Sequence, residues 1–303
     1  MKKRLIFLVI ACIALTLSGC TGKTGEQPRR AEAFSVYSAG GLKIVRVVDM
    51  KGMLPTDLLL GDVAEIERLL PDKLCPNVIT SYVFDTGNEV VMLDTGFGDM
   101  QGGKVVENLR EAGYAPEDIS TIILTHLHGD HVGGTIRDHQ AVFKNAQVFV
   151  PEKELAFWTD KTNNLSRAPA VLANTFDLVD EFMRLYSGRV VTFKEGERVV
   201  EWLIPIAVPG HTDGHTMFEL AYGGEKRFVW GDIMHCLKAQ SANPDISVIF
   251  DTDPVMAAQT RKKVMNMVAD TGVPVFGGHF PSPGVMTFEK NFDGGYNYTP
   301  VYP

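Results

Sequence analysis

Short apolar runs separated by turns recur along most of this chain and predict a fold rich in strands. Residues 42–48 alternate in part between apolar and charged side chains, as a half-exposed strand does. Further strand-like runs lie at residues 77–84, 89–93, 121–124, 147–150, 189–193 and 199–203. Residues 104–112 and 254–270 are predicted to be helices, each with a glycine shortly after it that suits a helix C-terminus.

Several of these runs lead into a glycine or a loop that carries a polar residue. Residues 121–124 lead to a histidine cluster, and residues 207–208, 227–230 and 274–276 lead to His211, Asp232 and His279. A residue at a strand end is held by a rigid scaffold and stays accessible at the rim of the sheet. Strands with interleaved helices predict an α/β fold of two sheets covered by helices.

The N-terminal end has the pattern of a bacterial export signal. Three cations at positions 2–4 precede an apolar run at residues 5–17, which is too short to span a bilayer comfortably. The following Leu-Ser-Gly-Cys resembles a lipobox, in which Cys20 receives a lipid and becomes the first mature residue. Since Thr21 rather than Asp follows, the sorting pattern favours the outer membrane, facing the periplasm. The alternative is an ordinary cleaved signal with an incidental Cys20.

These features divide the chain into three parts. We expect a lipoprotein signal peptide at residues 1–19, a lipid-anchored flexible tether at 20–35 and a single folded domain at 36–303. The tether is predicted because Gly, Lys, Glu, Pro and Arg dominate there, with little apolar content.

The chain is acidic, with a formal net charge of −8, and loss of the signal's cations makes it more so. This balance argues against nucleic acid, whose phosphates need a basic surface. The expected partners are a small-molecule substrate and a membrane reached through the lipid on Cys20, and a homodimer is left open. Cys75 and Cys236 remain after processing, in an oxidising compartment if the chain is exported, but the sequence does not decide whether they pair.

The chemistry is concentrated in histidines and aspartates at metal-ligand spacings. Four potential ligands stand within six residues, and three more follow downstream. The full set is His126, His128, Asp130, His131, His211, Asp232 and His279. Five imidazoles and two carboxylates suit a pair of borderline-soft ions such as zinc, and an accidental cluster is the weak alternative.

The local spacing suggests how the ligands divide between two ions. His126 and His128 are two residues apart, so in an extended segment both side chains face one ion. Gly129 allows a sharp bend after them. His211 can complete three imidazoles at this first ion. The second ion can then be held by Asp130, His131 and His279, which leaves Asp232 to bridge the two.

These seven positions together resemble the dinuclear pattern of the metallo-β-lactamase superfamily. The resemblance implies a four-layer αββα sandwich with the site at one edge of the sheets. It also implies that Asp94, in Asp94-Thr95-Gly96, supports a ligand histidine from behind. The segments around Asp232, Asp251 and His279, and the pair Phe157-Trp158, look like methyl parathion hydrolase and its N-acyl homoserine lactonase-like relatives. Those lactonases usually have Tyr where this chain has His235.

The resemblance implies a dinuclear zinc hydrolase that opens lactones or cleaves phosphotriesters. Two cations about 3.5–4 Å apart share a water, and the resulting bridging hydroxide is the nucleophile. Asp130 is expected to pass a proton to the leaving group, and His235 to donate to the developing oxyanion. Alternatives are a thioester or β-lactam hydrolase on the same site and, from another class, a non-catalytic metal-binding lipoprotein.

Four residues near the motif keep a second interpretation. His215, four residues after His211, is predicted to be a hydrogen-bonded support of the site rather than a ligand. His235 is either a pocket residue or a support. Phe157 and Trp158 are candidates for an aromatic substrate pocket, and ordinary packing near a helix start is the alternative.

Overall fold

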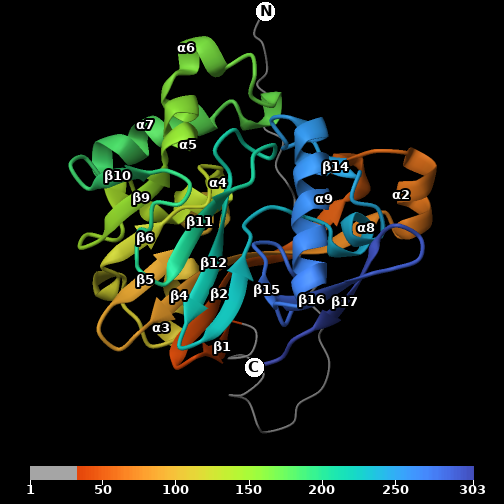
Figure 1. Ribbon diagram of the computed structural model, residues 1–303. Coiled ribbons are helices and arrows are strands. Elements are labelled where there is room, and N and C mark those ends of the chain that lie inside the picture. Colours follow the sequence, from red (N-terminus) through yellow and green to blue (C-terminus); the bar gives the residue numbers. More distant parts are fainter. Residues whose placement is uncertain (1–32) are drawn as a thin grey trace, which may run out of the picture.

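The computed structural model describes residues 33–303 (Figure 1). The predicted signal peptide and Cys20 therefore lie outside the described residues, as does the predicted tether up to residue 32. The first strand begins at Phe34, two residues before the expected start of the domain at residue 36.

Seven strands form the first sheet. Their order is β1 (Phe34–Ala39), β2 (Leu42–Pro55), β4 (Leu74–Asp85), β5 (Val90–Leu93), β6 (Thr121–Ile123), β9 (Gln147–Pro151) and β10 (Val190–Phe193). β5, β6, β9 and β10 run parallel to one another. Their carboxyl ends therefore share one edge of the sheet, and Asp94 and the histidine cluster both follow strands at this edge.

Six strands form the second sheet. Their order is β11 (Leu203–Ala207), β12 (Thr216–Tyr222), β13 (Glu225–Val229), β15 (Val275–Phe276), β16 (Val285–Lys290) and β17 (Tyr296–Pro300). β13 and β15 are parallel, and β11 has the same direction because two antiparallel pairings separate it from β13. His211, Asp232 and His279 thus follow strand ends at one edge of this sheet.

Helices cover the outer faces of the two sheets, so the fold is the expected αββα sandwich (Figure 1). The helices are α2 (Val63–Leu69), α3 (Val105–Glu111), α4 (Gly129–Val132), α5 (Glu152–Thr159), α6 (Lys161–Asn164), α7 (Thr175–Leu185), α8 (Leu237–Ala242) and α9 (Pro254–Thr271). Short 3-10 helices lie at Thr56–Leu58, Gly98–Gln101, Pro116–Asp118, Gly133–Thr135 and Ala170–Leu172. Two small two-stranded sheets pair β3 (Leu59–Leu60) with β14 (Ser247–Val248) and β7 (Ile136–Arg137) with β8 (Gln140–Ala141). Among the described residues, no helix has the length and apolar content needed to cross a membrane.

Three of the four apolar clusters in the described residues hold these layers together. One packs α3, α5 and α7 on the first sheet, a second fills the space between the sheets, and a third lies under α9. The inter-sheet cluster is rich in aromatic rings, with Tyr82 and Tyr37 edge-on to Phe276 at centroid distances of 5.3 and 5.4 Å. This rigid interior fixes the two sheet edges relative to each other, and the candidate site spans both edges.

Two sequence predictions show where the hydrophobic pattern is sufficient and where it is not. The helix predicted at residues 254–270 is confirmed as α9, with Asp253 capping the Met256 N–H and Gly272 ending the helix at φ 65. The strand predicted at residues 199–203 is wrong. Val200 and Leu203 form only an isolated bridge across a tight turn, and the strand starts at Leu203, where pairing with β12 becomes available.

Candidate metal centre

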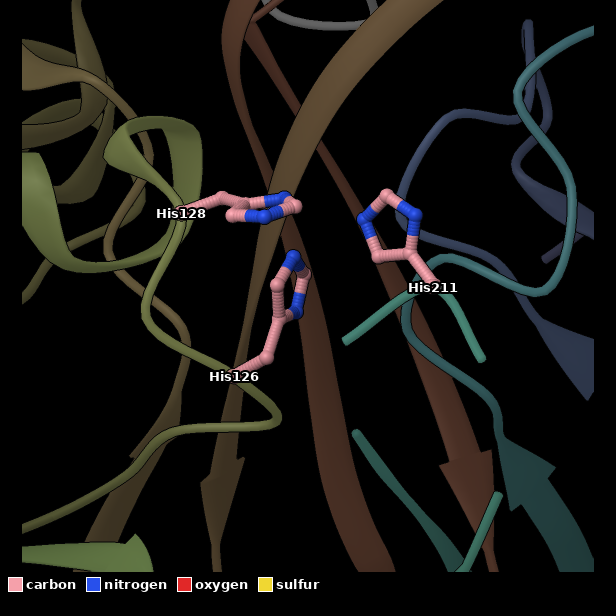
Figure 2. A group of neighbouring side chains, drawn as sticks. All are labelled: His126, His128 and His211. Atoms are coloured by element: carbon pink, nitrogen blue, oxygen red, sulfur yellow. The ribbon is translucent and has the colours of Figure 1, made fainter. Parts of the chain in front are cut away.

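Seven side chains from both sheet edges converge at one point between them. They form two groups in which the ligand atoms lie within 4.8 Å of one another, and His211 and Asp232 form a third such group with His235. We call His126, His128 and His211 the triple-histidine group, and Asp130, His131, Asp232 and His279 the mixed group. Figure 2 shows the three imidazoles of the first group facing a common point, two from the loop after β6 and one from the loop after β11. The local spacing predicts the same three imidazoles at the first ion, and it leaves Asp232 to bridge the two ions.

The Asp232 carboxylate lies between the two groups. Its Oδ2 atom is 3.4 Å from His211 Nε2 and 3.7 Å from His126 Nε2. The same oxygen is 2.9 Å from His279 Nε2, and Oδ1 is 3.2 Å from His131 Nε2. Burial raises the pKa of Asp232, but the surrounding imidazoles outweigh burial and hold it well below its ordinary value. The residue is therefore an anion placed where it reaches both groups.

The ligand atoms of this cluster are buried and poorly satisfied. The Nε2 atoms of His126, His128, His131 and His211 are all buried and have no hydrogen-bond partner among the described residues. Orphaned polar atoms in an interior are costly. Lone pairs that converge without partners fit divalent cations with nitrogen and oxygen ligands such as zinc.

Asp94 supports the mixed group from behind. Its Oδ2 accepts from His131 Nδ1 at 2.9 Å and from the Thr125 hydroxyl at 2.9 Å, and its Oδ1 accepts from the Thr125 N–H at 2.8 Å. Asp94 has φ 55, a left-handed conformation that is uncommon for a residue with a side chain. Three hydrogen bonds thus hold a strained residue where it orients His131, and the other nitrogen of that ring faces the ligand cluster.

Two further residues orient ligands in the same way, and sequence reasoning assigned neither this role. Asp251 Oδ1 bonds His211 Nδ1 at 2.8 Å, and Asn77 Oδ1 lies 3.3 Å from His279 Nδ1. They stand 40 and 202 residues from their histidines. No local spacing connects them, although Asp251 lies in a segment that the family resemblance had already marked.

His215 contacts the site through the backbone of Asp232. Its Nε2 accepts the backbone N–H of Asp232 at 3.0 Å, and the side chain is buried. Gly231 makes this approach possible, because it adopts φ +57 and a Cβ there would lie 2.5 Å from His215 Nε2. Burial lowers the pKa of His215 to about 3, so the ring is neutral and can accept.

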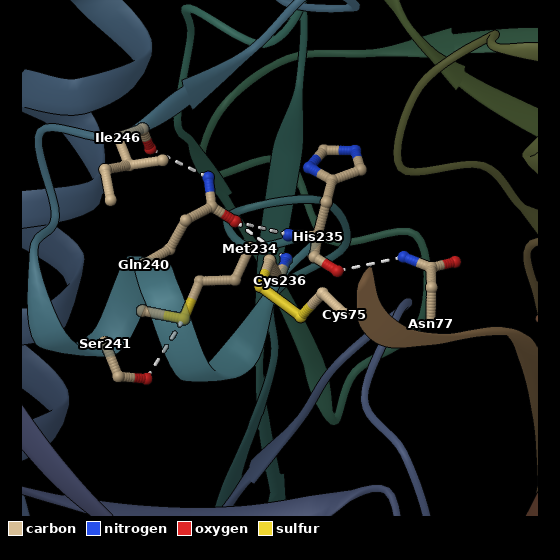
Figure 3. Close-up of a disulfide and its surroundings, with 8 residues drawn as sticks. All are labelled: Cys75, Asn77, Met234, His235, Cys236, Gln240, Ser241 and Ile246. Carbon is tan, nitrogen blue, oxygen red and sulfur yellow. Dashed lines mark hydrogen bonds between the residues drawn. A yellow bond between two sulfur atoms is a disulfide. The ribbon is translucent and has the colours of Figure 1, made fainter. Parts of the chain in front are cut away.

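His235 lies inside the site and beside a disulfide. Its Nε2 is 3.1 Å from Asp232 Oδ2, and burial lowers its pKa to about 4. Figure 3 shows Cys236 bonded to Cys75, and Asn77 Nδ2 donating to the His235 carbonyl at 2.9 Å. The two cysteines left open by the sequence are therefore paired. The cross-link ties β4 to the loop that carries Asp232 and His235.

Phe157 and Trp158 occupy a different place from the proposed aromatic pocket. They are 3% and 0% exposed and belong to the core under α5, which is the ordinary packing kept as the alternative. Trp158 still matters for the site, since its ring contacts the His128 ring edge-on at a centroid distance of 5.7 Å. Asp130, by contrast, has 17% of its side chain exposed and is the most accessible of the seven candidate ligands.

Comparison with known proteins places the chain among metal-dependent hydrolases. The model of the metallo-beta-lactamase superfamily matches residues 76–279. The chain is 34% identical over 67 residues to a probable metallo-hydrolase of Methanocaldococcus jannaschii, covering 22% of this chain and 30% of the relative. It is 24% identical over 183 residues to an atrochrysone carboxyl ACP thioesterase of Passalora fulva, covering 60% of this chain and 45% of the relative. The chain thus spans less than half the length of these curated relatives.

Solved structures match the whole domain. The crystal structure of hydrolase AbOPH in the beta lactamase superfamily gives a TM-score of 0.82 at 28% identity, covering 89% of this chain and 98% of that one. AidC, a dizinc quorum-quenching lactonase solved with a product, gives a TM-score of 0.82 at 24% identity, with the same coverage of 89% and 98%. The likeness to AidC is one of fold.

Proposed function

The chain belongs to the metallo-β-lactamase superfamily, and from this premise we propose that it is a dinuclear zinc hydrolase acting on lactones or phosphotriesters. The observation that carries the proposal is the position of Asp232. A single buried carboxylate lies within 3.7 Å of imidazoles from both groups, as a ligand shared by two cations must.

The triple-histidine group would hold one ion and the mixed group the other, with Asp232 common to both. When bound, such ions supply a water of lowered pKa as the nucleophile and Lewis acidity toward the attacked oxygen. The protein's part is to fix the ligands, and the hydrogen bonds from Asp94 and Asp251 to His131 and His211 do this.

Two residues are suited to the proton and charge movements of hydrolysis. Asp130 is the accessible carboxylate of the cluster, so it can carry a proton between the nucleophile and the leaving oxygen. His235 is neutral, because burial lowers its pKa to about 4, and its ring can donate to a developing oxyanion beside Asp232.

Support for the substrate class comes from the structural neighbours. AidC was solved with an N-acyl homoserine product, and an N-acyl homoserine lactone hydrolase of the same fold was solved with N-hexanoyl-L-homoserine bound, which favours lactones for this chain. Phosphotriesters rest on the motif resemblance to methyl parathion hydrolase. Thioesters are the second candidate, because one curated relative is a carboxyl ACP thioesterase.

A substrate panel tests the proposal. The purified protein, stripped by a chelator and reloaded with zinc, is assayed on γ- and δ-lactones, acyl homoserine lactones, a paraoxon-like ester, nitrocefin and a glutathione thioester. We expect zinc-dependent turnover of a lactone or of the ester. Zinc binding without turnover on any substrate would favour the non-catalytic alternative, and turnover of nitrocefin alone would overturn the subgroup.

The location in the cell is a separate proposal. We infer from the lipobox resemblance that Cys20 carries a lipid and anchors the domain at the outer membrane, facing the periplasm. Metabolic labelling with an alkyne fatty acid should mark the wild-type chain and leave Cys20→Ala unlabelled. Equal labelling of both chains, or labelling of neither, would contradict the anchor.

A further inference from the structure

Glu154 is a carboxylate in the first turn of α5 that is 0% exposed. Both of its oxygens accept two hydrogen bonds. Oε1 accepts from the Leu127 N–H at 3.0 Å and from Trp158 Nε1 at 2.7 Å. Oε2 accepts from the Thr212 hydroxyl at 2.6 Å and from the Gly214 N–H at 3.0 Å. A buried charge is costly unless its lone pairs are satisfied in this way, so the position calls for an explanation.

The partners of Glu154 belong to the two loops that carry the triple-histidine group. Leu127 stands between His126 and His128, and Thr212 directly follows His211. Each oxygen of one carboxylate therefore holds one loop. The donors lie 27 and 58 residues from Glu154 along the chain, so the carboxylate joins loops that are distant in sequence, beside one backbone hydrogen bond from the Thr216 N–H to the Thr125 carbonyl at 3.0 Å.

The residues around the Glu154 carboxylate allow the second ligand loop to lie close to α5. A Cβ at position 214 would lie 2.3 Å from the Glu154 backbone nitrogen, so Gly214 lets the second loop reach the helix. Trp158 donates to Glu154 and also places its ring edge-on against His128 at 5.7 Å. Glu154 is thus linked to the position of His128 by two routes, one through the backbone of Leu127 and one through the ring of Trp158.

We propose that Glu154 is a positioning residue that sets the distance between the two ligand loops and so tunes metal binding by the triple-histidine group. The inference rests on the proposed metal centre and is independent of the substrate. It separates Glu154 from Asp94 and Asp251, which each orient a single histidine. A purely structural role, in which the carboxylate only anchors α5, is the competing explanation.

The substitution Glu154→Gln tests the proposal at nearly constant volume. A carboxamide keeps one accepting oxygen, and its NH₂ cannot accept from the N–H of Leu127 or Gly214, so one loop loses its anchor. Zinc affinity is measured by competition with a chromophoric chelator, and cobalt absorption reports the ligand field of each site. We expect one ion to bind about 10- to 100-fold more weakly and the other to bind as in the wild type.

Matched variants separate positioning from folding. Glu152→Gln changes an exposed carboxylate in the same helical turn and should bind both ions as the wild type does. Thr212→Val removes one donor to Glu154 and should weaken the same ion, whereas Thr212→Ser keeps the hydroxyl and should restore binding. This pair also decides the matter if Glu154→Gln does not fold.

Four outcomes would overturn parts of this proposal. If Glu154→Gln lowers the melting temperature but binds both ions normally, the carboxylate is only structural. If both ions weaken equally, or if Thr212→Ser fails to rescue Thr212→Val, the loop-spacing role is wrong. Failure of the wild-type chain to bind two ions would instead overturn the proposed function, and it is measured before the variants are compared.

Discussion

The triple-histidine group and the mixed group lie side by side, yet they differ in the kind of ligand they offer. Burial lowers the pKa of His126 and His128 well below the ordinary value, and neighbouring imidazoles add to the effect. Burial also lowers the pKa of His131, but Asp232 and two further carboxylates outweigh it and hold it well above the ordinary value. His211 of the first group resembles His131 in this respect, because burial lowers its pKa but Asp232 and Asp251 raise it to about 9. The first group therefore offers imidazoles alone, and the second group adds two carboxylates.

This difference indicates that the two groups depend on different features of the fold. Anionic ligands attract a cation over some distance, so the mixed group tolerates small displacements. Imidazoles bind a cation only when their lone pairs converge on it, so the triple-histidine group depends on how its two loops are held. Substitutions can test this contrast, because the residues that support each group are distinct.

The largest effect is expected at the residue that the two groups share. Asp232→Ala removes the carboxylate close to imidazoles of both groups, so we expect both ions to bind more weakly and turnover to fall about 100- to 1,000-fold. Asp232→Asn keeps the volume and separates lost charge from lost packing. Metal analysis and kinetics check this. Full metal content with near wild-type turnover in Asp232→Ala would show that Asp232 is not a ligand shared by two ions.

Next in size, the supports of the two groups should act separately. Asp94→Asn removes the carboxylate behind His131, and Asp251→Asn removes the carboxylate behind His211. Burial lowers the pKa of His211, but Asp232 and Asp251 outweigh burial and raise it to about 9. We expect each variant to lose about 10- to 100-fold in affinity for one ion, a different ion in each case. Cobalt titration distinguishes them. If both variants weaken the same ion, the division into two groups is wrong.

The same distinction separates what the sequence predicts from what it does not. Ligands such as His128 and Asp232 lie in the loops that follow short strands, so their spacing and the parallel order of the strands indicate where they gather. The supports Glu154, Asp251 and Asn77 come from distant segments and carry no local signal. Their roles arise only from tertiary packing, which hydrophobic periodicity does not encode.

Two other regions show the same limit. Residues 199–203 satisfy the strand pattern but lack a partner strand, so a turn forms there and pairing starts only at Leu203. Phe157 and Trp158 match a substrate-pocket motif, but the packing of α5 on the first sheet buries them. Local pattern thus identifies residue types, and tertiary contacts decide what each of them does.

His235 should have a smaller effect than the supports of the ligands. The ring lies 3.1 Å from Asp232, and burial lowers its pKa to about 4, so it is a neutral donor near neutral pH. We expect His235→Ala to lower turnover about 10-fold while both ions remain bound. Kinetics with parallel metal analysis check this. Unchanged turnover with full metal content would end the proposed oxyanion role, and loss of one ion would make His235 a ligand.

The smallest effect concerns His215, which holds the backbone of the shared Asp232. Burial lowers the pKa of His215 to about 3 in the folded state, whereas an unfolded histidine titrates near about 6.5. Between these values the unfolded chain binds the extra proton, so stability falls as pH falls, by up to about 1.4 kcal/mol per pH unit from this group. His215→Asn should lose this contribution, so its unfolding free energy should fall less steeply from about pH 6.5 to about pH 5. Urea unfolding of the metal-free protein measures the slope, with His139→Asn at an exposed position as the matched control. Equal slopes for His215→Asn and the wild type would mean that His215 is protonated in the folded state. A protonated imidazole has no lone pair, so it could not accept the hydrogen bond from the Asp232 N–H.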